Sequence, residues 1–247
     1  SSPRRKSSKP FASATTSSAP GAPTITAATG SDRAARVTFV PGANGGSPIL
    51  GYEYQTSAAG AWTAVPGAQS PVLISGLTNG TTYAVRIRAI NALGTGPSSS
   101  AVSVTPVTVP GAPAIVGDTV AGTDMTLNAA FTAPASNGGS AITTYEYSTD
   151  AGATWRARTD GSGVASPLVI TVLSSDGTTP LTNGETYSVE LRAVNAVGAG
   201  AASAVATGIS TAAPSKPSII TVTASREALA VSFTTGSNGG SAITAYE

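Results

Sequence analysis

The residues that could do chemistry in this sequence lie in short loops rich in Gly, Ser and Thr. The motif Asn-Gly-Gly-Ser begins at Asn44, Asn137 and Asn238, and paired glycines can hold a phosphate group. The motif lacks the lysine and the strand-loop-helix setting of a phosphate loop, so we interpret each copy as a turn that needs positive φ. Asp160 in TDGSG and Asp176 in SSDGTT each place one carboxylate in such a loop. Calcium needs several carboxylates in one loop, so we predict turns here as well.

Histidine and cysteine are both absent from the 247 residues. Histidine is the commonest general acid–base group and metal ligand, and cysteine is the other main zinc ligand. Ordinary zinc sites, Ser-His and Cys-His nucleophiles and disulfides are therefore excluded. Because no paired carboxylates or ligand clusters replace them, the sequence predicts no enzyme, no metal site and no cofactor.

Two tryptophans are candidates for an interaction surface. Trp62 and Trp155 lie eight residues after Tyr54 and Tyr147, so they occupy matched positions. An aromatic ring at the end of a strand can stack on a sugar or anchor an interface. The alternative is that each ring caps a hydrophobic core, and its recurrence at a matched position favours this second interpretation.

The composition indicates a β protein. Charged residues make up 10% of the sequence, well below the roughly 25% typical of globular proteins. Abundant Gly, Pro, Thr and Val favour short strands separated by turns. No apolar run approaches the about 18–20 residues that span a bilayer, so we expect no membrane insertion.

The positive charge is concentrated at the start of the chain. Four of the 13 basic residues lie in the first ten positions, which leaves 9 basic against 12 acidic residues in the remainder. That balance disfavours a nucleic-acid partner. Residues 1–19 are rich in Ser, Thr and Pro, so we expect a flexible basic linker there.

Internal repetition organises the rest of the chain. The segment LTNGTTYAVRIRAINALGTG (77–96) returns as LTNGETYSVELRAVNAVGAG (181–200), and Pro-Gly-Ala-Pro at 20–23 returns at 110–113. Matching landmarks lie about 90 to 100 residues apart, which is the size of a whole domain. We therefore expect, after the linker, complete domains over 20–107 and 108–212 and the N-terminal part of a third domain over 213–247.

The segments that begin at Tyr83 and Tyr187 alternate with period two. Apolar residues occupy every second position, whereas Arg86, Arg88 and Arg192 fall on the opposite face. This alternation is typical of a half-buried antiparallel strand, and we expect the arginines to be ordinary surface charges. About seven such strands in each unit, with turn residues between them, predict a two-sheet sandwich.

Each unit resembles a fibronectin type III domain of the kind strung along bacterial secreted and surface proteins. The motifs that carry the resemblance are PGAP, NGGSxIxxYE and LTNGxTYxVx[IL]RA[IV]NA, within residues 20–247. The resemblance implies an all-β chain of tandem immunoglobulin-like, seven-stranded β-sandwiches. It also implies a tyrosine corner formed by Leu77 with Tyr83 and by Leu181 with Tyr187, in which the phenol is hydrogen-bonded to backbone just upstream.

The sequence departs from the family pattern on the second strand. The family usually has tryptophan there, whereas this chain has phenylalanine in all three units, which makes the core slightly smaller. These residues are Phe39, Phe131 and Phe233.

The second unit contains a longer loop than the first. Asp176-Gly177 suits a tight hairpin turn, so we expect an extended, protruding hairpin near residues 172–182. Binding function in such folds is often carried by loops. Lengthening a hairpin also has a mild thermodynamic cost, so a neutral insertion is the alternative.

The third unit comprises only residues 213–247. Val231, Phe233 and Tyr246 should lie on an apolar face that lacks its sixth and seventh strands. Continuing chain or a neighbouring chain would supply those strands. The sequence is therefore expected to be part of a longer array.

Two classes of function fit these observations. The first is a non-catalytic structural or adhesive array, which acts as a spacer or interaction module in an extracellular assembly such as a bacterial surface protein, a filament or a virus particle. Its partners would be other proteins or copies of itself, at a cell or particle surface. The alternative is an accessory spacer or carbohydrate-binding module of a secreted polysaccharide-degrading enzyme, with polysaccharide as the partner.

Overall fold

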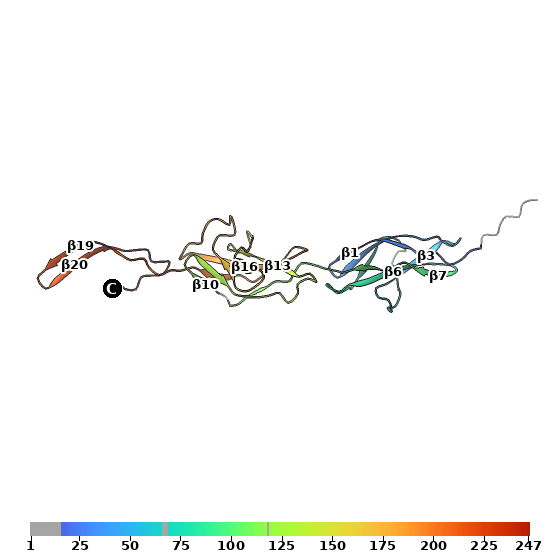
Figure 1. Cartoon of the computed structure of the whole chain (residues 1–247), viewed down its shortest axis with the longest axis horizontal. Helices are drawn as coiled ribbons and strands as arrows, with labels where there is room; N and C mark the ends of the chain where they lie inside the picture. The colour runs from blue at the N-terminus through green and yellow to red at the C-terminus, as the bar shows by residue number, and fades with distance from the viewer. Residues whose placement is uncertain (1–15, 66–68, 118) are drawn as a thin grey trace, which may run out of the picture. The chain divides into compact units, whose positions relative to one another are not determined.

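The computed structural model describes residues 16–65, 69–117 and 119–247, and most of the predicted linker, residues 1–15, lies outside this range. The chain divides into two compact units, Ser1–Val107 and Thr108–Glu247. The described residues form strands and no helix, so no helix among them could cross a membrane (Figure 1). The all-β prediction is confirmed.

The first unit is a sandwich of two antiparallel sheets. One sheet has the order β1-β2-β5, and the other has the order β4-β3-β6-β7, with β8 also pairing with β6. The last strand of the sandwich is interrupted, so β7 and β8 share one position, and the unit has seven strands when they are counted once. The strands are β1 (Thr24–Ser31), β2 (Ala34–Val40), β3 (Ile49–Gln55), β4 (Thr63–Ala64), β5 (Val72–Ser75), β6 (Tyr83–Asn91), β7 (Gly94–Ser98) and β8 (Val102–Val104).

The core of the first unit lies between these sheets. Val85, Ile87 and Ala89 on β6 are fully buried, as the period-two alternation predicts. Phe39 of β2 and Tyr52 of β3 meet edge to face with ring centroids 4.7 Å apart. The smaller ring at the second-strand position is therefore packed directly against a tyrosine of the opposite sheet.

The second unit repeats the sandwich with more interruptions. The pairs β9/β10, β11/β12 and β17/β18 each take the place of one strand, so seven positions are again occupied. A parallel pairing of β10 with β18 joins the layers into the order β14-β13-β16-β18-β10-β11-β15. The strands are β9 (Ala114–Ile115), β10 (Thr119–Thr123), β11 (Thr126–Ala129), β12 (Phe131–Thr132), β13 (Ile142–Ser148), β14 (Arg156–Ala157), β15 (Leu168–Ile170), β16 (Thr186–Asn195), β17 (Ala199–Ala202) and β18 (Ala206–Ile209).

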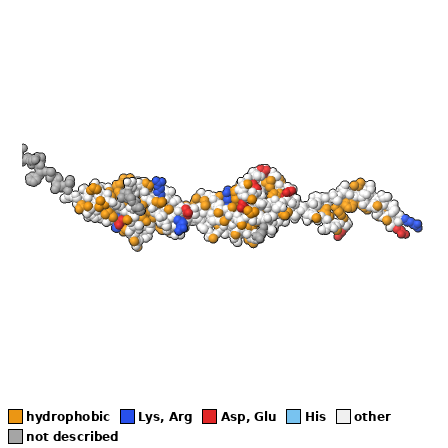
Figure 2. Space-filling view, turned by 180° about the vertical axis from the view of Figure 1, so that it is seen from behind, with side chains coloured by type: hydrophobic (Ala, Val, Ile, Leu, Met, Phe, Trp, Pro, Cys, Tyr) orange, Lys and Arg blue, Asp and Glu red, His pale blue; other side chains and the backbone are white. Residues whose placement is uncertain are grey.

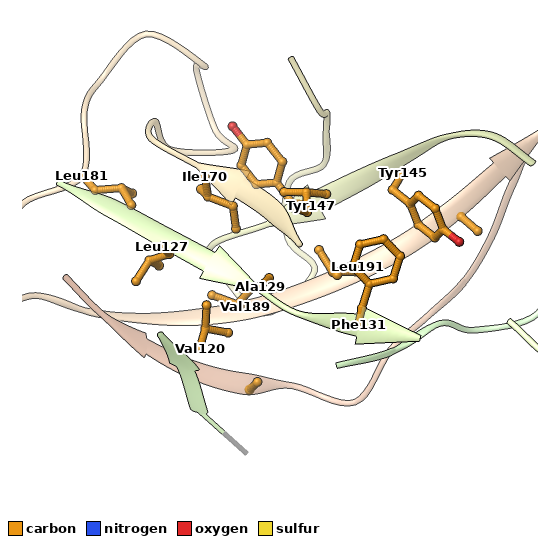
Figure 3. Packing of buried hydrophobic residues seen from close by; sticks show 13 residues of the cluster. Val120, Leu127, Ala129, Phe131, Tyr145, Tyr147, Ile170, Leu181, Val189 and Leu191 are labelled. Carbon is orange, nitrogen blue, oxygen red and sulfur yellow. The ribbon is translucent and has the colours of Figure 1, made fainter. Parts of the chain in front are cut away.

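The core of the second unit is drawn in Figure 3. Val189 and Leu191 of β16 lie among side chains from β11, β12 and β13, and both are fully buried. Phe131 and Tyr145 pack with ring centroids 4.5 Å apart, matching the aromatic pair of the first unit. The inward positions predicted from the sequence are thus the buried ones.

Residues 213–247 form a hairpin of β19 (Ser218–Ser225) and β20 (Ala228–Thr234). Residues 241–247, which include Tyr246, have no strand pairing. In the complete units the equivalent strands, β3 and β13, pair with β6 and β16, and this hairpin has no such neighbour among the described residues. Val231, Phe233 and Tyr246 are accordingly 47%, 39% and 44% exposed.

Candidate interaction surface

The Asn-Gly-Gly-Ser motifs are turns that hold the segment leading into each sandwich. Asn44 Oδ1 accepts a hydrogen bond from the Gly46 amide at 2.9 Å, which closes the turn. The Ser18 amide donates to the Gly45 carbonyl at 2.8 Å. Gly45 has φ +68°, and a Cβ there would overlap the Ser18 carbonyl oxygen. Glycine is required by both the backbone conformation and this close approach.

A buried asparagine at the end of the sixth strand completes the attachment. Asn91 is 3% exposed, and its Nδ2 donates to the carbonyl oxygens of Ser18 at 2.8 Å and Asn44 at 2.9 Å. Asn195 makes the same two bonds in the second unit, to Thr108 and Asn137. The repeated sequence motif contains this asparagine, but the motif alone did not predict its hydrogen bonds. A polar residue at an inward position of an alternating strand was the available clue.

The glycine of the Leu-Thr-Asn-Gly motif holds the segment that leaves the sandwich. The Gly80 amide donates to the Pro106 carbonyl at 2.8 Å, and the Thr108 amide donates to the Gly138 carbonyl at 2.8 Å. Pro106 is thus bonded to the first unit and Thr108 to the second. Val107 is the only residue between these two positions.

Both predicted corner tyrosines accept hydrogen bonds from backbone upstream. The Thr78 amide donates to Tyr83 Oη at 2.9 Å, and the matching bond to Tyr187 Oη is 2.8 Å long. Leu77 and Leu181 are buried in the cores of their units. These residues support the corner of each sandwich.

Trp62 and Trp155 directly precede β4 and β14 and lie outside the hydrophobic core clusters. The guanidinium carbon of Arg88 is 4.1 Å from the Trp62 ring centroid, and that of Arg192 is 4.3 Å from the Trp155 ring centroid. The expectation that the rings cap the core is therefore wrong. Each ring is half-buried against a cation, an arrangement that contributes about 0.5–1 kcal/mol at an exposed site.

The stacked arginines are also paired with glutamates on the neighbouring strand. Arg88 lies directly opposite Glu53 in the β3–β6 register, and their closest nitrogen and oxygen are 2.6 Å apart. Arg192 and Glu146 form the same pair at 2.6 Å in the second unit. We call each Glu–Arg–Trp arrangement a stack. Its arginine is held on two sides, which corrects the expectation of ordinary surface charges.

The loop at Asp176-Gly177 contains the predicted turn but not an extended hairpin. Its two limbs are paired at one isolated bridge, between Val172 and Pro180. Asp176 Oδ1 accepts hydrogen bonds from the two amides that follow Gly177, both at 2.9 Å. The carboxylate thereby takes donors that a strand ladder would use. The Thr179 hydroxyl, followed by these two amides, lowers the pKa of Asp176 to about 2.

The base of this loop is bonded to the end of β13. Ser174 is buried, and its Oγ accepts a hydrogen bond from the Thr149 amide at 3.0 Å. The Ser174 amide donates in return to Thr149 Oγ1 at 3.1 Å. Reciprocal bonds of this kind fix the loop to the sheet, so Asp176 and Gly177 are presented at a defined place on the second unit.

The TDGSG loop is closed by a buried ion pair. Arg158 Nε and Nη2 donate to the two carboxylate oxygens of Asp160 at 2.9 and 2.8 Å. Asp160 Oδ2 also accepts the Val169 amide at 2.9 Å. The Arg158 bond is the main reason that the pKa of Asp160 lies well below its ordinary value. Both carboxylate oxygens of Asp160 accept hydrogen bonds within the protein, and the described residues contain no group of three acidic side chains placed for a metal.

A known family profile matches the first unit. Residues 18–105 match the sequence profile of the fibronectin type III domain. Brother of CDO from Homo sapiens is 41% identical over 83 residues, which are 31% of this chain and 7% of that protein. The chain therefore corresponds to a small part of that relative.

Two solved structures of several domains each are also similar to this chain. The chicken CNTN1 FN1–FN3 crystal structure is 23% identical, with a TM-score of 0.37, and the match covers 87% of this chain and 75% of that one. A crystal structure of titin domains is 18% identical, with a TM-score of 0.44, over 74% of this chain and 61% of that one. The segment 18–105 thus matches the fibronectin type III domain in its sequence profile and folds as a two-sheet sandwich.

Proposed function

We propose that this chain is a non-catalytic array of fibronectin type III domains that acts as a spacer and interaction module in an extracellular assembly. The observation that carries the proposal is the short joint between the units. Pro106 is hydrogen-bonded to Gly80 and Thr108 to Gly138, with Val107 alone between them. A flexible tether needs many free residues, whereas a joint of this length limits how far two domains can move independently.

The same construction recurs at the end of the second sandwich. The Gly184 amide donates to the Ser210 carbonyl at 2.9 Å, and the Ala212 amide donates to the Gly239 carbonyl at 2.7 Å. Thr211 lies between these two positions. The recurrent glycines of the two motifs therefore support a repeated joint and a repeated domain, which is what a spacer built from many units requires.

Composition and motif resemblance support the extracellular location that we propose for the array. Only 10% of residues are charged and cysteine is absent, so each domain must be stable from its core and backbone bonds. The PGAP and NGGS motifs resemble those of bacterial surface and secreted proteins. A bacterial surface protein, a filament and a virus particle are the assemblies in which we place the array, with proteins or further copies as partners.

The joint can be tested by single-molecule energy transfer, because the chain has no cysteine of its own. We place dyes on cysteines introduced at Thr38 and Thr207, which are exposed on β2 and β18. A Gly-Ser hexapeptide inserted after Val107 is expected to broaden the distribution of distances between the two dyes. Asn195→Ala removes the hydrogen bond to the Thr108 carbonyl, and it is expected to broaden the distribution to a smaller extent than the insertion does. If the chain without the insertion gave a distance distribution as broad as that of the insertion variant, the proposed spacer function would be contradicted.

A carbohydrate-binding module of a secreted polysaccharide-degrading enzyme is the second candidate. The observation that favours it is the position of Trp62 and Trp155 outside the core, each with one ring face on an arginine. The opposite ring face could stack on a sugar. If so, the chain should sediment with insoluble cellulose, chitin or xylan, and Trp62→Ala with Trp155→Ala should abolish this, while Thr38→Ala leaves it unchanged. No sedimentation with any of the three excludes this candidate for these polymers.

A further inference from the structure

The two sandwiches share one fold but carry opposite net charge. Residues 18–107 contain four arginines and two acidic residues, whereas residues 108–212 contain eight acidic residues and three arginines. In Figure 2, Arg side chains are prominent on the first unit, and Asp and Glu side chains on the second. Opposite net charges on two domains of one chain favour contact between unlike domains over contact between like ones.

The difference is sharpest beside the stacks. Arg86 lies on β6 opposite Gln55, and Glu190 lies at the equivalent place on β16 opposite Ser148. Both are half-buried, outward-facing residues two positions before the stacked arginine. Within the described part of the chain, neither Arg86 nor Glu190 takes part in an ion pair.

Each outer sheet face therefore combines a tryptophan with an excess of one charge. On the first unit, Arg86 and Arg88 outnumber Glu53. On the second unit, glutamates outnumber the arginine; the residues are Glu146, Glu190 and Arg192. Tryptophan and arginine are the residue types that most often dominate binding energy in protein interfaces.

We propose that the β6 face of the first unit binds the β16 face of the second unit in another copy of this chain. Arg86 would pair with Glu190 of the other copy, next to the two stacks. This proposal rests on the function in an assembly proposed above, and it identifies another copy of the chain as the partner. Contacts between two first units or two second units would bring like charges together, so the pairing is selective. Each copy offers one face of each kind, and such contacts can continue from copy to copy into an open chain.

Charge reversal tests this pairing in the full chain. The parent should self-associate in sedimentation velocity at about 10 mM salt and less at about 500 mM, because salt screens the charges. Arg86→Glu alone and Glu190→Arg alone should each weaken association by about tenfold or more. An equimolar mixture of the two variants should associate again, because every unlike face pair between them is complementary.

Two matched variants control for net charge. Arg36→Glu lies on β2 of the other sheet and Glu185→Arg lies before β16, and both positions are exposed. They make the same charge changes and should retain association. Equal weakening by the controls, a mixture that stays monomeric, or a parent that is monomeric at low salt would each overturn the proposal. The dilute energy-transfer experiment on single molecules is unaffected by these outcomes, so failure of the pairing is distinguishable from failure of the spacer.

Discussion

Replacing Asp160 by alanine is expected to destabilise the second sandwich by about 3–5 kcal/mol at neutral pH, because Arg158 is left buried without its counter-charge. The side chains of Arg158 and Asp160 are 3% and 10% exposed. The same change removes the acceptor of the Val169 amide at the start of β15. Urea unfolding, followed by the indole N–H resonances of the two tryptophans, measures the effect, because Trp62 reports the first unit and Trp155 the second.

The control for this variant is Asp176→Asn, which removes one carboxylate from an exposed position of the same unit. It should change the midpoint of the Trp155 signal far less than Asp160→Ala does. The Trp62 signal should be unchanged in both variants. Equal effects of the two substitutions would show that net charge, rather than the buried pair, determines the stability of this unit.

The same ion pair predicts a pH dependence. The pKa of Asp160 is lowered from 3.8 in the folded protein, so the folded state binds fewer protons than the unfolded state below about pH 4. The stability that the pair contributes is fully present above that pH and is lost as the pH falls through the lower, folded value. Asp160→Asn should remove this part of the acid destabilisation, and the difference between the two unfolding curves below pH 4 measures it.

Leu191→Ala is expected to destabilise the second sandwich by about 2–5 kcal/mol, since it removes buried methyl groups and leaves a cavity. Leu191 is fully buried at the centre of β16, among the residues that Figure 3 shows. The flanking core side chains come from several strands, so they cannot all move into the space. Equilibrium unfolding monitored at Trp155 measures the loss.

Thr207→Ala serves as the matched control on the adjacent strand. Thr207 is exposed on β18, which pairs with β16, and its substitution should change the free energy of unfolding by less than about 0.5 kcal/mol. A loss below about 1 kcal/mol for Leu191→Ala would mean that the core closes around the smaller side chain. That result would contradict the packing described for this unit.

The inward and outward faces of the strands were predictable from local sequence alone. Val85, Ile87 and Ala89 alternate with arginines, and such alternation specifies a half-buried strand without knowledge of its neighbours. The repetition of whole motifs likewise predicted the sandwich class, because each copy must satisfy the same packing. Both properties can be recognised in the sequence without knowledge of any contact between strands.

The interactions of the polar residues depended on contacts between distant segments. Trp62 stacks on Arg88 because β4 and β6 both flank β3, and the tryptophan's spacing from Tyr54 contains no information about that arginine. The loop at Asp176 is similar, because its carboxylate and Ser174 find backbone partners that replace a hairpin ladder.

The sequence by itself determined which apolar residues of the strands face inward, and it indicated repeated β-sandwiches, since alternation and repetition can both be recognised without knowledge of tertiary contacts. Only the tertiary structure showed what the recurrent glycine and asparagine motifs do. Asn91 reaches Ser18 across 73 residues, and Gly80 and Gly138 hold the segments on either side of Val107. Hydrogen bonds of this kind depend on register and loop closure, which are settled only when the strands have paired.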